Sequence, residues 1–294
     1  MRPPLRLAAV ALLAAISWKS PAAPAAADLW SRDNLAAWCI VPYDAAKRGP
    51  EARADMLAGL GLRKFAYDWR AAHVPTFDAE VAAMKARRIE IVAWWFPQKL
   101  DASARTILDV IARHGIRPQL WVTGGGAPTK DAAQQEARIK AEVERLQPIV
   151  AAAANLGCRV GLYNHGGWFG EPENQLAVLE RLRADGATNV GLVYNFHHGH
   201  DHLDRFAEFW PKIQRHVLAV NVNGMIAGGD KSGKKLLYVG EGDRELGLLR
   251  VIDASGWRGL VGVLNHRTDV DAEVGLRENL IGLERLVGKI HSVR

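Results

Sequence analysis

The sequence predicts one large α/β domain, a closed (β/α)8 barrel of the TIM type. Short apolar runs of strand length alternate with amphipathic stretches of helix length along the whole chain. Eight such runs occur, at residues 36–41, 64–67, 89–95, 119–122, 159–163, 190–194, 217–222 and 259–264. Most begin about 25 to 31 residues after the previous one, the length of a strand with a crossover helix and its loops. Eight such units favour a barrel, with an open doubly wound sheet as the main alternative.

The intervening stretches carry the helical period. Apolar residues recur on one helical face at Ile139, Val143, Leu146 and Val150, and again at Leu276, Leu280, Leu283 and Val287. Pro148 is expected to kink or split the first of these helices. The intervals after the fourth and seventh runs are longer, about 40 residues each. The second contains a predicted mobile loop, 227–235, and then a segment, 236–243, that we place at the barrel mouth.

The N-terminus is predicted to be a cleaved secretory signal peptide, residues 1–27, followed by the barrel at residues 28–294. Two arginines precede the apolar run 7–16, which is too short to span a bilayer, and an A-x-A pattern ends the segment. A retained N-terminal anchor is the alternative. We therefore expect an exported protein, periplasmic or secreted, without stable membrane insertion after cleavage.

The charge and cysteine content narrow the functional classes. The formal charge is +6, and removal of three basic residues with the signal leaves about +3, with both signs interspersed. This pattern does not indicate a nucleic-acid partner. Glycines 124–126 are not followed by Lys-Ser/Thr, so no nucleotide cofactor is expected. Cys39 and Cys158 fall on opposite sides of the predicted barrel, so we expect two buried free thiols.

Polar and aromatic residues gather where the apolar runs end. In a barrel of this kind the C-terminal ends of the strands form the catalytic face. The candidates for general acid/base catalysis are two histidines from separate strands, His165 and His198, and one carboxylate from the long loop, Glu241. Flat aromatic rings beside amides, a carboxylate and a guanidinium suit a sugar ring, and the predicted binding residues are Asp68, Arg70, Trp95, Trp121, Asn164, Trp168, Asn195 and Asn221.

Several motifs at these strand ends carry a more specific resemblance. They are YDW at 67–69, AWWFP at 93–97, NHGGWFGEPENQ at 164–175, YNFHHGH at 194–200, NVNGM at 221–225 and GEGD at 240–243. Together they resemble the xylose isomerase-like barrel superfamily, and more narrowly the bacterial proteins described as sugar phosphate isomerase/epimerase. The resemblance covers the chain from the first strand to the end, and the motifs after strands five and six are its most specific parts.

The resemblance implies a divalent metal held by Glu, Asp, His and Glu from strands five to eight. At the corresponding positions this chain has Tyr163, Asn195, Asn221 and Asn265. Neutral amides are poor replacements for carboxylates around a divalent ion, so the usual metal site is expected to be absent.

Two alternatives remain for this protein: a metal site built from different residues, or an active site that uses no metal. Three imidazoles and a carboxylate would suit one divalent Zn, Mn, Co or Ni ion, and the residues available are His165, His198, His266 and Glu241.

The expected function is that of an exported carbohydrate-active enzyme that removes a proton next to a sugar carbonyl. The resemblance allows an isomerase or epimerase, or a lyase that eliminates from a 3-keto-glycoside, because these reactions share that first step. The alternative is a non-catalytic sugar-binding barrel that has lost the family metal site. A hydrolase with paired carboxylates is a weaker third possibility. The only partner predicted is a small carbohydrate, and the sequence does not define the oligomeric state.

Overall fold

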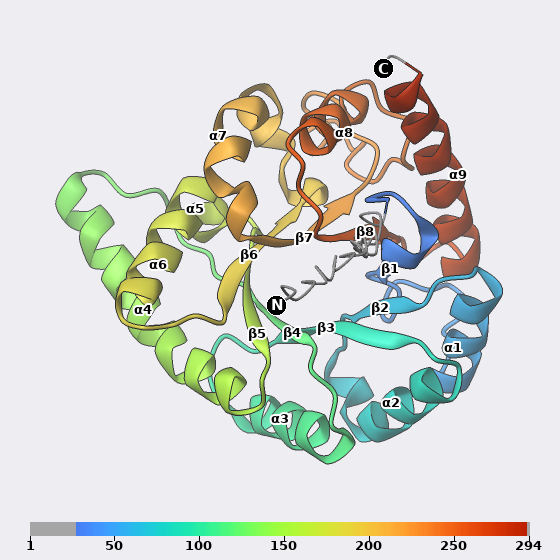
Figure 1. Ribbon diagram of the computed structural model, residues 1–294, viewed down its shortest axis with the longest axis horizontal. Coiled ribbons are helices and arrows are strands. Elements are labelled where there is room, and N and C mark those ends of the chain that lie inside the picture. The colour runs from blue at the N-terminus through green and yellow to red at the C-terminus, as the bar shows by residue number, and fades with distance from the viewer. Residues whose placement is uncertain (1–27, 293–294) are drawn as a thin grey trace, which may run out of the picture.

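Eight parallel strands pair in sequence order and close into a barrel, which confirms the predicted fold (Figure 1). The computed structural model describes residues 28–292. The strands are β1 (Leu35–Trp38), β2 (Lys64–Tyr67), β3 (Glu90–Phe96), β4 (Gln119–Val122), β5 (Arg159–Tyr163), β6 (Val190–Asn195), β7 (Val217–Val222) and β8 (Leu260–Leu264). Pairing of β1 with β8 closes the barrel and excludes the open sheet.

Helices surround the strands on the outside, as Figure 1 shows. The α-helices are α1 (Pro50–Gly59), α2 (Phe77–Ala86), α3 (Ala102–His114), α4 (Ala132–Asn155), α5 (Gly167–Gly170), α6 (Pro172–Ala184), α7 (Phe206–Ile213), α8 (Glu245–Ala254) and α9 (Ala272–His291). Short 3-10 helices lie at η1 (Arg32–Asn34), η2 (Ala71–Thr76), η3 (Phe196–His198), η4 (His200–Arg205) and η5 (Gln214–His216). The structure confirms the predicted apolar stripes of α4 and α9, which are buried apart from the half-buried Val287.

Two sequence-based details need correction. Pro148 does not split the fourth helix, because α4 runs without interruption from Ala132 to Asn155. Pro148 lies on the solvent side, where water can hydrate the carbonyl that loses its amide partner. The first strand ends at Trp38 rather than Val41, because Cys39 adopts a left-handed backbone conformation with φ 55°.

The barrel interior is filled by aromatic rings. The rings of Trp38 and Trp121 lie 4.0 Å apart, and each is 6.0 Å from the ring of Tyr163. Two strand glycines make room for them: a Cβ at Gly262 would lie 2.2 Å from the Trp38 ring, and one at Gly161 would lie 2.6 Å from the Trp121 ring. The barrel interior is therefore filled by side chains, and it can form the floor of a site at the C-terminal ends of the strands.

The remaining structural expectations concern cysteines and the membrane. Cys39 and Cys158 are both buried and free, as predicted. Among residues 28–292, no helix has the length and hydropathy needed to cross a bilayer. The predicted signal peptide lies outside the described residues.

Candidate active site

A cavity of about 220 Å³ opens at the C-terminal ends of the strands. Its walls come from the ends of β1 to β6 and of β8. The lining residues are Cys39, Tyr43, Asp68, Arg70, Trp95, Thr123, Tyr163, His165, His198 and His266. Six of these were predicted as site residues, so the barrel brings together the carboxylate, the guanidinium, one indole and the three imidazoles.

Asp68 is the buried carboxyl of this cavity. It is 1% exposed, and its Oδ1 accepts a hydrogen bond from the Val41 backbone N–H at 3.2 Å. Its Oδ2 has no hydrogen-bond partner within the described chain. Burial raises the pKa of Asp68 to about 7, although the positive charge of Arg70 opposes this shift. A carboxyl with this pKa exchanges protons readily near neutral pH, which is what a general acid or base requires.

Four histidine rings lie in a row, and three of them line the cavity, whereas His197 is buried behind it. The ring centroids of His165 and His198 are 4.3 Å apart, and His197 lies 4.6 Å from both His198 and His266. Burial, with charges from neighbouring imidazoles and Lys235, lowers the pKa of His198 far below its usual value. Burial and the charges of Lys235 and Arg70 lower the pKa of His165, and the pKa of His266 falls to about 4, mainly through burial. At neutral pH these rings are therefore uncharged, and each has one N–H donor and one acceptor nitrogen.

Arg70 supplies a fixed positive charge at the rim. Its guanidinium donates to the carbonyls of Asp68 at 3.0 Å and Trp69 at 2.8 Å, and to the Tyr43 hydroxyl at 3.2 Å. The Tyr43 ring stacks on His266 with centroids 3.7 Å apart. These contacts hold the guanidinium and one imidazole in place beside Asp68.

The positions that hold a metal in the resembled superfamily form a neutral hydrogen-bonded network here. The Asn195 amide donates to the Tyr163 hydroxyl at 2.5 Å and accepts from the Asn221 amide at 2.7 Å. Burial raises the pKa of Tyr163 well above its usual value, so the hydroxyl stays protonated. Asn265 donates to the Tyr43 carbonyl. The buried amide oxygens of Asn221 and Asn265 have no hydrogen-bond partner within the described chain. The set nevertheless offers no carboxylate, and neutral amides and a protonated phenol do not fit a divalent ion.

The rebuilt metal site is not assembled either. Glu241 is exposed, and its Oε2 accepts from the Tyr238 backbone N–H at 2.9 Å, which stabilises a turn outside the cavity. Within residues 28–292, no three His, Cys, Asp or Glu side chains are grouped so as to hold a metal ion. His165, His198 and His266 do line one cavity, but the predicted fourth ligand, Glu241, does not join them.

The other predicted binding residues lie below or beside the cavity. Trp121 is buried beneath Trp95, with their rings 4.7 Å apart. Asn164 pairs with the backbone of Asn195, accepting from its N–H at 2.7 Å and donating to its carbonyl at 3.2 Å. Trp168 donates to Gln135 at 2.7 Å. Asn195 and Asn221 belong to the network described above, so these five residues support the cavity without lining it.

Four cavity residues were not assigned as site residues from the sequence. Tyr43, Thr123 and Tyr163 stand at strand ends, and that position alone was a usable signal. Cys39 carried no such signal, because it lies within an apolar run whose continuation as a loop depends on its left-handed backbone.

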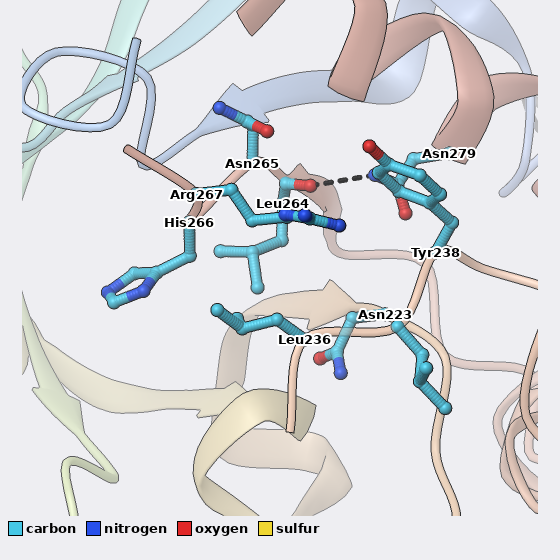
Figure 2. Close-up of a pocket in the computed structure, with 9 residues that line it drawn as sticks. Asn223, Leu236, Tyr238, Leu264, Asn265, His266, Arg267 and Asn279 are labelled. Atoms are coloured by element: carbon cyan, nitrogen blue, oxygen red, sulfur yellow. Dashed lines mark hydrogen bonds between the residues drawn. The ribbon is translucent and has the colours of Figure 1, made fainter. Parts of the chain in front are cut away.

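A second, much smaller hollow of about 10 Å³ separates β8 from the segment 236–243 (Figure 2). Asn279 of α9 bridges the two, donating to the Leu264 carbonyl at 2.9 Å and accepting from the Val239 N–H at 2.9 Å. The segment is thereby held beside the strand end, as predicted. In Figure 2 the His266 ring points away from Asn279.

Across nearly its whole described length, the chain has the fold of xylose isomerase-like TIM barrels. It matches 3-keto-D-glucoside 4-epimerase, YcjR, from E. coli with 13% identity and a TM-score of 0.62, over 86% of this chain and 99% of the other. It matches a xylose isomerase domain protein from Alicyclobacillus acidocaldarius with 21% identity and a TM-score of 0.62, over 88% and 99%.

A third match is the IolI protein with a bound zinc atom, with 12% identity and a TM-score of 0.65, over 87% of this chain and 99% of the other. The sequence matches no protein-family profile and no curated relative. At these identities the comparisons show the fold, and the reaction must be inferred from the cavity.

Proposed function

We propose that the protein is an exported carbohydrate-active enzyme that removes a proton from the carbon next to a sugar carbonyl. One observation carries the proposal: a buried carboxyl with a pKa near 7, Asp68, lines the same small cavity as the uncharged imidazoles of His165 and His198. Proton abstraction at neutral pH needs a base of this strength together with donors for the enolate oxygen. The names of the structural neighbours, which include sugar epimerases, support a carbohydrate substrate.

In the proposed reaction, the ionised Asp68 takes the proton from the carbon beside the carbonyl. The electron pair of that C–H bond moves into the new C–C double bond, and the carbonyl oxygen becomes an enolate. Imidazole N–H groups of His165 and His198 donate hydrogen bonds to this oxygen, and the Arg70 charge stabilises it electrostatically. Return of the proton gives an epimer or isomer, whereas departure of a substituent on the next carbon gives elimination.

The size and surface of the cavity favour a single sugar ring. Its volume of about 220 Å³ lies below the roughly 300 Å³ at which pockets for drug-sized ligands begin. Trp95 supplies an aromatic wall on which the C–H face of a sugar can pack. The predicted signal peptide supports export, and an exported enzyme would meet free keto sugars or keto-glycosides rather than sugar phosphates.

The neutral network at Tyr163, Asn195 and Asn221 favours one competing function, a sugar-binding barrel without catalysis. Exchange of the substrate C–H proton with deuterium in D₂O, followed by NMR over a panel of keto sugars, separates the two functions. An enzyme catalyses exchange, and Asp68→Asn should reduce the rate roughly 10² to 10⁴-fold while sugar binding persists. The same substitution at the exposed Asp78 should leave the rate unchanged.

The histidines and the metal question are tested in the same assay. His165→Gln and His198→Gln should each slow exchange with little change in sugar affinity. A chelator should leave the rate unchanged, since the donor set at the family metal positions is neutral. Saturable binding of a keto sugar without any exchange would overturn the proposed enzyme and establish the sugar-binding function.

A further inference from the structure

The opposite end of the barrel carries a further hollow with a different lining, which we call the basal basin. It is lined at the N-terminal ends of the strands by Asn34, Lys64, Glu90, Val92, Arg117, Gln119, Gly157, Arg159, Leu218, Arg258, Gly259 and Leu260. Its volume is about 340 Å³. Lys64 and Arg159 are the first residues of β2 and β5, and Arg117 and Arg258 stand just before β4 and β8. Four segments far apart in the sequence therefore each bring one cation to this hollow.

The charge of the basal basin is strongly unbalanced. Four cations, Lys64, Arg117, Arg159 and Arg258, face one carboxylate, Glu90. None of the five forms an ion pair with another residue of the described chain. By contrast, twelve arginines elsewhere among residues 28–292 contact a carboxylate. The interspersed charge of the sequence as a whole hides this local excess.

Arg159 lies near a further cation, Arg183, and has no carboxylate partner within the described chain. Partial desolvation lowers the pKa of the exposed Arg159 guanidinium, and the nearby charge of Arg183 lowers it further. Arg183 itself contacts His216 Nδ1 at 2.7 Å and the Val190 carbonyl at 3.2 Å, so it is not neutralised by these contacts. A bound anion would offset the repulsion between Arg159 and Arg183.

The side chains also indicate the kind of anion. Guanidinium groups present forked donors that match the oxygens of phosphate. The Gln119 amide oxygen accepts from Trp121 Nε1 at 2.9 Å, which leaves the amide nitrogen as a further donor. No aromatic residue is among those that line the basal basin, so it lacks the flat surface that favours a sugar ring. We propose that the basal basin binds a small multivalent phosphate anion, at a site separate from the proposed active site.

The test is isothermal titration calorimetry, in which inorganic pyrophosphate is titrated into the intact protein at low ionic strength and again at about 0.15 M salt. We expect saturable binding near one equivalent, weakened by salt. The double substitution Arg117→Gln with Arg159→Gln should weaken binding on the order of tenfold or more, because each removes a charge-assisted hydrogen bond. Both side chains are exposed, so folding should be retained, and thermal unfolding checks this.

Two controls make the outcome decisive. Arg113→Gln removes an exposed arginine that pairs with Asp78 on the helical layer, and pyrophosphate affinity should not change. The single charge reversal Arg159→Glu should weaken binding even if the double variant fails to fold. The proposal is overturned if pyrophosphate does not bind saturably, or if Arg113→Gln weakens binding as much as the basin substitutions do. Binding only to vesicles with anionic phospholipid headgroups would also overturn a small-molecule site and indicate a membrane-surface contact.

Discussion

Replacement of Asp68 by Asn should make the protein more stable at alkaline pH. The folded state raises the pKa of this carboxyl from 3.8 to about 7, a shift of about 3 units, and each unit corresponds to about 1.4 kcal/mol. Well below pH 4 the carboxyl is protonated in both the folded and the unfolded state, so it adds no pH dependence to the free energy of unfolding. Between pH 4 and 7 the unfolded chain loses the proton first, so stability falls by about 4 kcal/mol in total. Asparagine keeps the oxygen that accepts from Val41 but cannot ionise, and this fall should disappear.

The measurement is the free energy of unfolding from urea titrations at several pH values between 4 and 9. Asp68→Asn and the wild type should agree near pH 4 and diverge by about 4 kcal/mol above pH 8, with the variant more stable. Asp78→Asn is the matched control: ion pairing lowers the pKa of Asp78, so the stabilisation that the substitution removes is present throughout pH 4 to 9 and is lost only as the pH falls below about 4. Its profile should therefore run parallel to that of the wild type between pH 4 and 9. Parallel profiles for the wild type and Asp68→Asn would refute the assignment of a perturbed, buried carboxyl.

Two further predictions concern packing of the scaffold. Glu80→Gln breaks the buried ion pair with Arg53 between α1 and α2 and should cost about 3 to 5 kcal/mol of unfolding free energy, whereas Glu136→Gln, which breaks an exposed pair with Arg181, should cost under about 1 kcal/mol. Equal losses in urea titrations would contradict the burial argument. Gly282→Ala should lower the melting temperature, because its Cβ would lie 1.7 Å from the Val239 carbonyl oxygen, and Gly247→Ala in open space on α8 should raise it slightly. A neutral Gly282→Ala would mean that the 236–243 segment can move away from α9.

The fold was predictable because buried parallel strands appear as continuous apolar runs with abrupt ends. The run 159–163 is bounded by the polar Asn164, and β5 has these limits. The same rule extended the first strand too far, because residues 39–41 are also apolar. They are buried in the loop that follows β1, where the backbone leaves the extended conformation at Cys39. Hydrophobicity reports burial, and it does not distinguish a buried loop from a strand.

The candidate site was only partly predictable, because position at a strand end does not determine the direction of a side chain. Side chains alternate along a strand, so Tyr163 and His165 face the cavity while Asn164 between them pairs with β6. Trp95 lines the cavity, whereas Trp94 packs against Phe77 with ring centroids 5.0 Å apart. Glu241 lies in a long loop outside any strand, so no such alternation applied to it.

The indole cluster inside the barrel gives this protein a built-in optical signal. The rings of Trp38, Trp95 and Trp121 lie 4.0 to 5.6 Å apart, close enough for their electronic transitions to couple and to share excitation energy. Trp95 is the member of this group that meets the cavity, so a molecule seated against it changes the emission of the coupled set. Near-ultraviolet circular dichroism and tryptophan fluorescence can therefore rank candidate ligands before any product has been identified.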